Sequence, residues 1–164
     1  MLNVTAFQET LHADMCGPAS LKIVLDYYGV NQTEKELADI IGVVPEVGVD
    51  AVSIKKVAER LGFKVFVKDG ASFNDIQMWL ERGVPVIVDW FTRGRTDYDE
   101  AAIADGHYSV VTGLDDEYVH LQDPEIGGVR KLRRDDFLKV WFDFRGKYIT
   151  ADELIIRQII AVYT

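Results

Sequence analysis

The sequence contains few of the residues that crosslink or interrupt a chain. It has one cysteine and four prolines among its 164 residues. A single cysteine excludes an internal disulfide and a thiolate-rich zinc site. No apolar run approaches the roughly 20 residues that a membrane-spanning helix requires, and the first residues do not join a basic stretch to an apolar one, as a signal peptide does. We therefore expect a cytoplasmic protein without membrane insertion, unless a leader that directs export precedes this sequence in its parent.

Positive charge is also scarce. Lysine and arginine total 18, against 27 aspartates and glutamates, which gives a formal net charge of -9. An acidic surface repels phosphate groups, so nucleic acid is not an expected partner. The other bulk properties, including a hydrophobic share of 48%, are those of an ordinary globular protein, and no repeat or low-complexity linker divides the chain. These features predict a single domain over residues 1–164.

The first half of the chain has the apolar spacing of helices. In residues 17–28 the apolar positions follow the i, i+3, i+4, i+7 pattern, and apolar residues on other sides indicate a helix that is buried nearly all round. Further amphipathic helices are predicted at 33–41, 50–61 and 72–81. Thr33 and Ser72 each precede an acidic residue by three positions, which is typical of a capping box at a helix start.

The second half has the period of strands. Strands are predicted at 63–67, 84–89, 108–114, 118–122, 129–132 and 154–163, with one short helix at 135–141. Helices that come first and strands that come later favour an α+β fold over an alternating α/β fold. The stretch from Phe91 to Gly106 has little pattern, and loops of this length are often functional flaps, so we expect it to gate a substrate groove.

Cys16 stands directly before the first predicted helix. Pro18 suits the first helical turn, where its missing N–H needs no partner, and Gly17 lets the backbone approach a bound group closely. The free N–H groups and partial positive charge of a helix N-terminus favour a thiolate over a thiol. Cys16 is therefore a candidate nucleophile; the alternative is a buried structural cysteine, which is a common role for a free cysteine.

A candidate base and its orienting acid lie in a predicted hairpin. Strands 108–114 and 118–122 flank a tight turn, and centring that turn on Asp115 places His107 directly opposite Asp123. A slip of the register by one residue would put His107 opposite Pro124 and remove this pairing. His107 could instead bond a nearby loop, and Asp123, which precedes Pro124, could instead shape a turn. Together with Cys16, however, the pair supplies what acyl transfer requires: a nucleophile, a base and a carboxylate that orients the base.

The residues around these positions resemble a known family. The stretch from Cys16 to Gly29, CGPASLKIVLDYYG, resembles the cysteine motif of the C39 peptidases, the bacteriocin-processing branch of the papain-like enzymes. GHYSVVTGLD, which contains His107, and QDP, which contains Asp123, resemble the histidine and aspartate motifs of that family. The resemblance implies a papain-like fold, with a helical lobe that carries the cysteine and an antiparallel β lobe that carries the other two residues.

The resemblance also implies an activity and a further site residue. It predicts a cysteine peptidase that acts on a peptide or protein substrate without a cofactor or a metal ion. The family uses a glutamine before the cysteine to complete the oxyanion hole, and Gln8 is the candidate, further from Cys16 than is usual; a solvated loop amide is the alternative. The sequence leaves open whether the protein works with a transporter on a separate chain or without one. It also leaves open two alternative functions: deamidation or acyl transfer by the same residues, and peptide binding by an inactive module.

Two other features are expected to be structural. His120 should face away from His107 on the same hairpin, because successive residues of a strand alternate between its faces. Gly127 and Gly128 match the double-glycine sites that C39 enzymes cut, but their place before a predicted strand favours a plain turn.

Overall fold

A computed structural model describes residues 1–11, 15–43, 48–92, 106–144 and 149–164. The helices are α1 (Cys16–Tyr27), α2 (Glu34–Ile41), α3 (Ala51–Arg60), α4 (Phe73–Glu81), α5 (Arg134–Val140) and the short 3-10 helix η3 (Ala151–Glu153). The strands are β1 (Lys64–Lys68), β2 (Val86–Phe91), β3 (Gly106–Leu114), β4 (Tyr118–Asp123), β5 (Gly128–Arg133), β6 (Phe142–Phe144), β7 (Leu154–Ile156) and β8 (Ile159–Tyr163).

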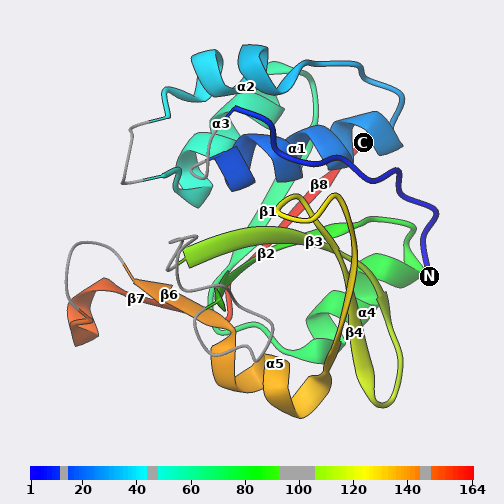
Figure 1. Ribbon diagram of the computed structural model, residues 1–164, viewed down its shortest axis with the longest axis vertical. Coiled ribbons are helices and arrows are strands. Elements are labelled where there is room, and N and C mark those ends of the chain that lie inside the picture. The colour runs from blue at the N-terminus through cyan, green and yellow to red at the C-terminus, as the bar shows by residue number, and fades with distance from the viewer. Residues whose placement is uncertain (12–14, 44–47, 93–105, 145–148) are drawn as a thin grey trace.

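The strands form an antiparallel sheet with helices on both faces. Six of them lie in the order β1-β8-β2-β3-β4-β5, and β6 pairs with β7 in a small second sheet. Figure 1 shows α1, α2 and α3 on one side of the large sheet and α4 and α5 on the other. Neighbouring residues of β2 accordingly belong to different cores: Ile87 packs with α1 and α3, and Val86 and Val88 pack with α4 and α5. This is the expected α+β fold.

The helix starts follow the predicted capping chemistry. Thr33 and Ser72 both form complete capping boxes, with Glu36 and Asp75 respectively. Helix α1 differs, because its N-cap residue is Met15, whose side chain is apolar. Nine of its twelve residues are buried, which agrees with a helix that is apolar on most sides. The free N–H groups at its first turn therefore lie inside the protein, beside Cys16.

Three local expectations need correction. The strand predicted at 154–163 is two strands, β7 and β8, because Arg157 between them has a φ of 49°, a value that L-residues avoid within a strand. Strand β6 was not predicted, since three residues are too few to show alternation. Phe91 and Gly106, predicted to bound a flap, are strand residues that pair with each other; residues 93–105 between them lie outside the described part of the chain.

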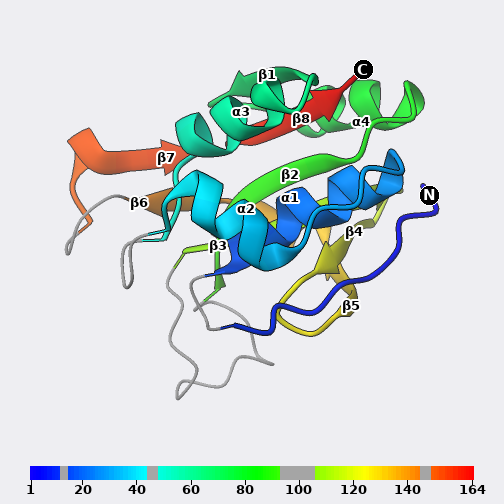
Figure 2. The ribbon, with the colours of Figure 1, turned by 90° about the horizontal axis from the view of Figure 1, so that it is seen from above.

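The N-terminal segment runs along the sheet before α1 begins. Figure 2 shows it passing beside β4 and β5. The Leu2 N–H donates to the Thr112 carbonyl at 2.7 Å, and the Gln122 amide donates to the Val4 carbonyl at 3.1 Å. Within the described ranges, no helix is both long and apolar enough to cross a membrane.

Candidate active site

Cys16 is the first residue of α1 and is 8% exposed. The glycine after it makes room for the neighbouring structure: a Cβ placed on Gly17 would lie 3.2 Å from the Val49 Cβ and 3.6 Å from the Tyr108 ring. The Cys16 side chain lies close enough to His107 to raise the pKa of the imidazole, after the larger effect of Asp123. The first residue of α1 therefore lies beside His107, at the start of β3.

His107 lies between Cys16 and Asp123. Its Nε2 atom is 2.5 Å from the Asp123 Oδ1 atom, and both residues are almost fully buried, at 2% and 1% exposed. Because Nε2 is engaged by Asp123, the ring presents Nδ1 to the thiol. The Trp90 ring packs against the imidazole with centroids 5.9 Å apart, which limits how far it can swing. The structure therefore places His107 between the Cys16 side chain, which influences its pKa, and Asp123, to which it is hydrogen-bonded.

The strand register that achieves this is not the predicted one. Next to the turn Leu114 pairs with Val119, whereas further along Val110 pairs with Gln122. Continued to the end of the sheet, this register places Ser109 opposite Asp123. His107 and Asp123 are therefore diagonal neighbours on one face, a separation that long side chains bridge.

A β-bulge at Thr112 makes this arrangement possible. Between Val111 and Gly113 strand β3 has one residue more than β4. Without the extra residue, Asp123 would stand opposite Val110, on the face of the sheet that His107 does not use. The predicted pairing was wrong because the turn is centred between Asp116 and Glu117, as the pairing of Leu114 with Val119 shows, and not on Asp115. The bulge then shifts the register by one residue, so the two residues do meet, on a diagonal.

The charges of the three groups are coupled. Burial by itself would lower the pKa of His107, but the charge and hydrogen bond of Asp123 and the hydrogen bond of Cys16 outweigh it and raise the pKa well above its ordinary value. Burial would likewise raise the pKa of Asp123, yet the charge and hydrogen bond of His107 and the charge of Arg130 bring it down to about 2. The site therefore favours an imidazolium bound to a carboxylate at neutral pH.

Arg130 is a site residue that the sequence analysis missed. Its guanidinium binds the second oxygen of Asp123 and donates to a Glu125 oxygen at 3.1 Å. The β4–β5 hairpin could have indicated it, because Asp123 pairs with Gly128 and Arg130 lies two residues further along, on the same face. His107, Asp123 and Glu125 are close enough to hold a metal ion, but a guanidinium already binds both carboxylates, so this donor set does not favour one.

Gln8 lies at the edge of this cluster and is exposed. Its amide donates to the Glu125 carbonyl at 3.2 Å, and its Cβ packs on Gly127, in the turn after Asp123. The next residue, Glu9, points inward, as expected for alternate residues of an extended segment. Among the described residues, its Oε2 atom is buried without a hydrogen-bond partner, and burial raises its pKa to about 7, against the opposing charge of His107.

The residues that were expected to be structural are so placed. His120 Nε2 lies 2.9 Å from an oxygen of Asp115 in the hairpin turn. His120 and Asp123 are an odd number of residues apart on β4, so they use opposite faces of the strand. Gly127 has a φ of 62° and its N–H donates to the Asp123 carbonyl, so it forms the turn that leads into β5.

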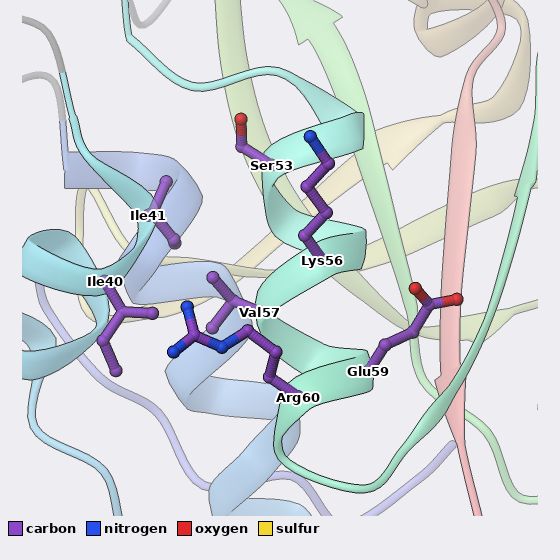
Figure 3. A pocket seen from close by; sticks show the side chains of 7 residues that line it. All are labelled: Ile40, Ile41, Ser53, Lys56, Val57, Glu59 and Arg60. Atoms are coloured by element: carbon purple, nitrogen blue, oxygen red, sulfur yellow. The ribbon is translucent and has the colours of Figure 1, made fainter.

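A pocket elsewhere on the molecule is separate from this cluster. Figure 3 shows it between α2 and α3, with Ile40 and Ile41 facing the side chains of α3. The α3 residues that line it are Ser53, Lys56, Val57, Glu59 and Arg60. It contains none of the residues bound to His107, so it does not form part of the candidate site.

Comparisons with known proteins indicate the family of this chain. Residues 1–149 match the profile described as Peptidase_C39 like family. The chain is 30% identical over 128 residues to the transport/processing ATP-binding protein ComA of Streptococcus pneumoniae, an alignment that covers 77% of this chain and 16% of that protein. The chain thus spans about a sixth of the length of this relative.

Solved structures share the fold at low sequence identity. A C39-like protein from Bacillus anthracis superimposes with a TM-score of 0.74 at 19% identity, covering 99% of this chain and 95% of that one. A double glycine motif protease of an AMS/PCAT transporter, solved with its leader peptide, gives 0.69 at 18% identity, covering 98% and 91%. With the family profile matching most of its length and its helices and antiparallel sheet arranged as in these structures, the chain belongs to the C39-like peptidase family.

Proposed function

We propose that this protein is a cysteine peptidase in which Cys16 is the nucleophile, His107 the general acid and base, and Asp123 the residue that orients His107. The observation that carries the proposal is the position of the His107 ring, beside the Cys16 side chain on one side and hydrogen-bonded to Asp123, at 2.5 Å, on the other. A buried imidazole held between a thiol and a carboxylate is the arrangement that thiol-dependent acyl transfer needs.

The chemistry follows from the positions of the protons. The Cys16 thiolate forms a bond to the peptide carbonyl carbon, and the electron pair of the C=O bond moves to the oxygen. Collapse of this intermediate breaks the C–N bond, and His107 gives its Nδ1 proton to the leaving amine. Neutral His107 then takes a proton from water as the water oxygen bonds to the thioester carbon. The C–S bond breaks, which releases the acid and restores the Cys16 thiolate beside protonated His107. Asp123 accepts the hydrogen bond of the Nε2–H group throughout, so that this proton stays on the ring. Its negative charge stabilises the imidazolium whenever it forms.

The developing negative charge on the oxygen needs hydrogen-bond donors. The Cys16 backbone N–H, at the first turn of α1, is one candidate, and the Gln8 amide is the other. In the absence of substrate Gln8 donates to the Glu125 carbonyl, so its side chain must rotate when substrate binds. Gln8→Ala is expected to lower kcat by roughly 10²–10³, the usual effect of losing one such donor. Gln77→Ala, which removes an exposed glutamine amide on α4, is the matched control.

The names of similar proteins suggest the substrate. One is a double glycine motif protease solved with a leader peptide, and another is a transport/processing protein. We accordingly infer that the substrate is a peptide with two adjacent glycines at the cleavage point, delivered by or to a transporter. Cys16 and His107 are almost fully buried, so a substrate residue without a side chain would reach them most easily.

The test uses the fact that Cys16 is the sole cysteine. Iodoacetamide is expected to label the protein stoichiometrically at pH 6, where an ordinary thiol with a pKa of about 8.5 is only about 0.3% thiolate. Hydrolysis of a double-glycine peptide should be abolished in Cys16→Ala and in His107→Ala. Reactivity that rises only above pH 8, with no hydrolysis of any glycine-containing peptide, would contradict the proposal. Formation of an amine adduct in place of the acid would indicate acyl transfer.

A further inference from the structure

A pair of acidic side chains lies beside His107, and the proposed mechanism does not use it. Asp89 of β2 is 2% exposed, and its carboxyl lies within hydrogen-bonding reach of that of Asp143 of β6. Two carboxyl groups can share a hydrogen bond only if one of them holds a proton. Within the described structure, the Asp89 Oδ1 atom is buried and has no hydrogen-bond partner. Such an arrangement is costly to bury, and buried polar groups with an unmet partner are often found at functional sites.

The pair spans the start of the strand that carries His107. In the β2–β3 ladder Asp89 pairs with Tyr108, and the next residues, Trp90 and His107, pair with each other. Asp143 contacts the residue before His107: a Cβ placed on Gly106 would lie only 2.1 Å from an oxygen of Asp143. The Asp143 carboxylate therefore occupies the space where any other residue at position 106 would carry its side chain.

Strand β6 is fixed at this end of the sheet by further contacts. The Phe142 ring stacks on Phe91 of β2, with centroids 5.1 Å apart. The Phe144 N–H donates to the Asp143 Oδ1 atom at 2.7 Å, which orients that carboxylate. The bond between Asp89 and Asp143 thus joins β2 to β6 over the backbone that leads into His107.

The surroundings of the pair connect it to the reactive groups. Among the residues that the structure describes, the titratable groups that act on Asp89 are Asp143 of β6, Cys16 of α1, His107 of β3 and the Tyr108 hydroxyl. Burial first, and then the charge and hydrogen bond of Asp143, raise the pKa of Asp89 well above its ordinary value. The protonated form is therefore the one that fits this position at neutral pH.

We propose that Asp89 and Asp143 form a clamp that shares one proton, fixes the backbone at Gly106 and thereby positions His107 toward Cys16. Both are positioning residues, because they act through His107. The role in catalysis rests on the proposed function, but the geometric claim does not. The clamp requires a hydrogen bond between two side chains and does not require that Asp89 be an acid, so asparagine should replace it.

The experiment measures Cys16 alkylation by iodoacetamide against pH in matched variants. In Asp143→Ala the rate at pH 6 is expected to fall at least tenfold and the pH midpoint to rise, because a displaced His107 no longer stabilises the thiolate. Asp89→Asn keeps a neutral hydrogen-bonding group of the same shape and should retain the wild-type profile. Asp89→Ala should behave as Asp143→Ala does. Urea unfolding of each variant shows whether it is folded at pH 6.

Two results would overturn the clamp: a wild-type profile in Asp143→Ala, or a shifted profile in Asp89→Asn. A merely structural role would lower the unfolding midpoint without moving the alkylation profile. If both alanine variants fail to fold, Asp89→Asn decides the matter. Should wild-type Cys16 prove unreactive at pH 6, the NMR titration of the His107 ring gives the same information, with a lower midpoint expected in Asp143→Ala. A shifted profile with no peptide hydrolysis by the wild type would count against the proposed function alone.

Discussion

Replacing Asp123 by asparagine removes the negative charge that holds the imidazole of His107 in place. The carboxylate is 1% exposed and receives hydrogen bonds from His107, from Arg130 and from the Glu125 N–H. Asparagine has nearly the same shape, so the change removes charge with little loss of packing. Any loss of stability or of catalysis in Asp123→Asn therefore comes from the lost charge and not from a cavity.

The magnitude follows from the pKa of Asp123, which falls from 3.8 to about 2 in the folded protein. A depressed carboxylate pKa stabilises the fold above the unfolded value, here by about 2.5 kcal/mol at pH 7. That contribution is lost as the pH falls from 3.8 to 2, with about half remaining at pH 3. The uncompensated charge of Arg130 adds to the cost, since removing one member of a buried ion pair costs about 3–5 kcal/mol. We expect Asp123→Asn to lose between about 2.5 and 5 kcal/mol at pH 7.

The assay is urea unfolding of wild type and Asp123→Asn at pH 7 and at pH 3. Asp115 provides a matched control, because its pKa is also lowered to about 2, by His120 first and then by backbone N–H groups, but it is fully exposed. Asp115→Asn should unfold close to the wild type. In a peptidase assay, Asp123→Asn should lower kcat by roughly 10⁴, the effect of the same change in other triads. Equal unfolding midpoints for the two variants at pH 7 would refute the reasoning.

Three further substitutions test other parts of the structure. Glu9→Gln should raise stability at pH 8 but not at pH 4, because burial raises the pKa of Glu9 from 4.5 to about 7. The wild type therefore loses stability as the pH rises across that interval, by at most about 3.4 kcal/mol before solvent screening is considered. Urea midpoints that differ equally at both pH values would contradict this. Gly106→Ala places a Cβ 2.1 Å from the Asp143 carboxylate and should cost about 1–3 kcal/mol in thermal unfolding. The control is Gly128→Ala, whose Cβ would meet no described atom within 4 Å and which should cost little in the same experiment. Leu21→Ala empties a fully buried position of α1 and should cost about 2–5 kcal/mol in urea; a loss below 1 kcal/mol would show that the helix does not pack as described.

The local features of the fold could be predicted because their causes lie within a few residues. Thr33 and Ser72 each meet their capping partner three positions later, so the helix starts follow from the sequence alone. The turn at Asp115 is likewise local, since its carboxylate accepts the N–H groups of Glu117 and Tyr118. Strand β6 and the break at Arg157 could not be predicted, because packing against distant segments sets them and the sequence period does not show it.

In the candidate site too, some features could be predicted from the sequence and others depend on the tertiary structure. The residue types and motifs around Cys16, His107 and Asp123 identify them as partners from the sequence. The meeting of His107 with Asp123 depends on the extra residue Thr112, whose bulge keeps both on one face. Arg130 was within reach of the same hairpin reasoning, applied to the next pair of strands.

The sequence by itself determined which residues could do chemistry and which segments are helices or strands, because these depend on residue type and on neighbours along the chain. Only the tertiary structure decided that Glu9 turns its carboxyl inward while Gln8 turns outward, and that Asp89 meets Asp143 beside His107. The physical reason is that burial and long-range contact set the charge of these groups. Both depend on which distant residues pack together, and sequence spacing does not record that.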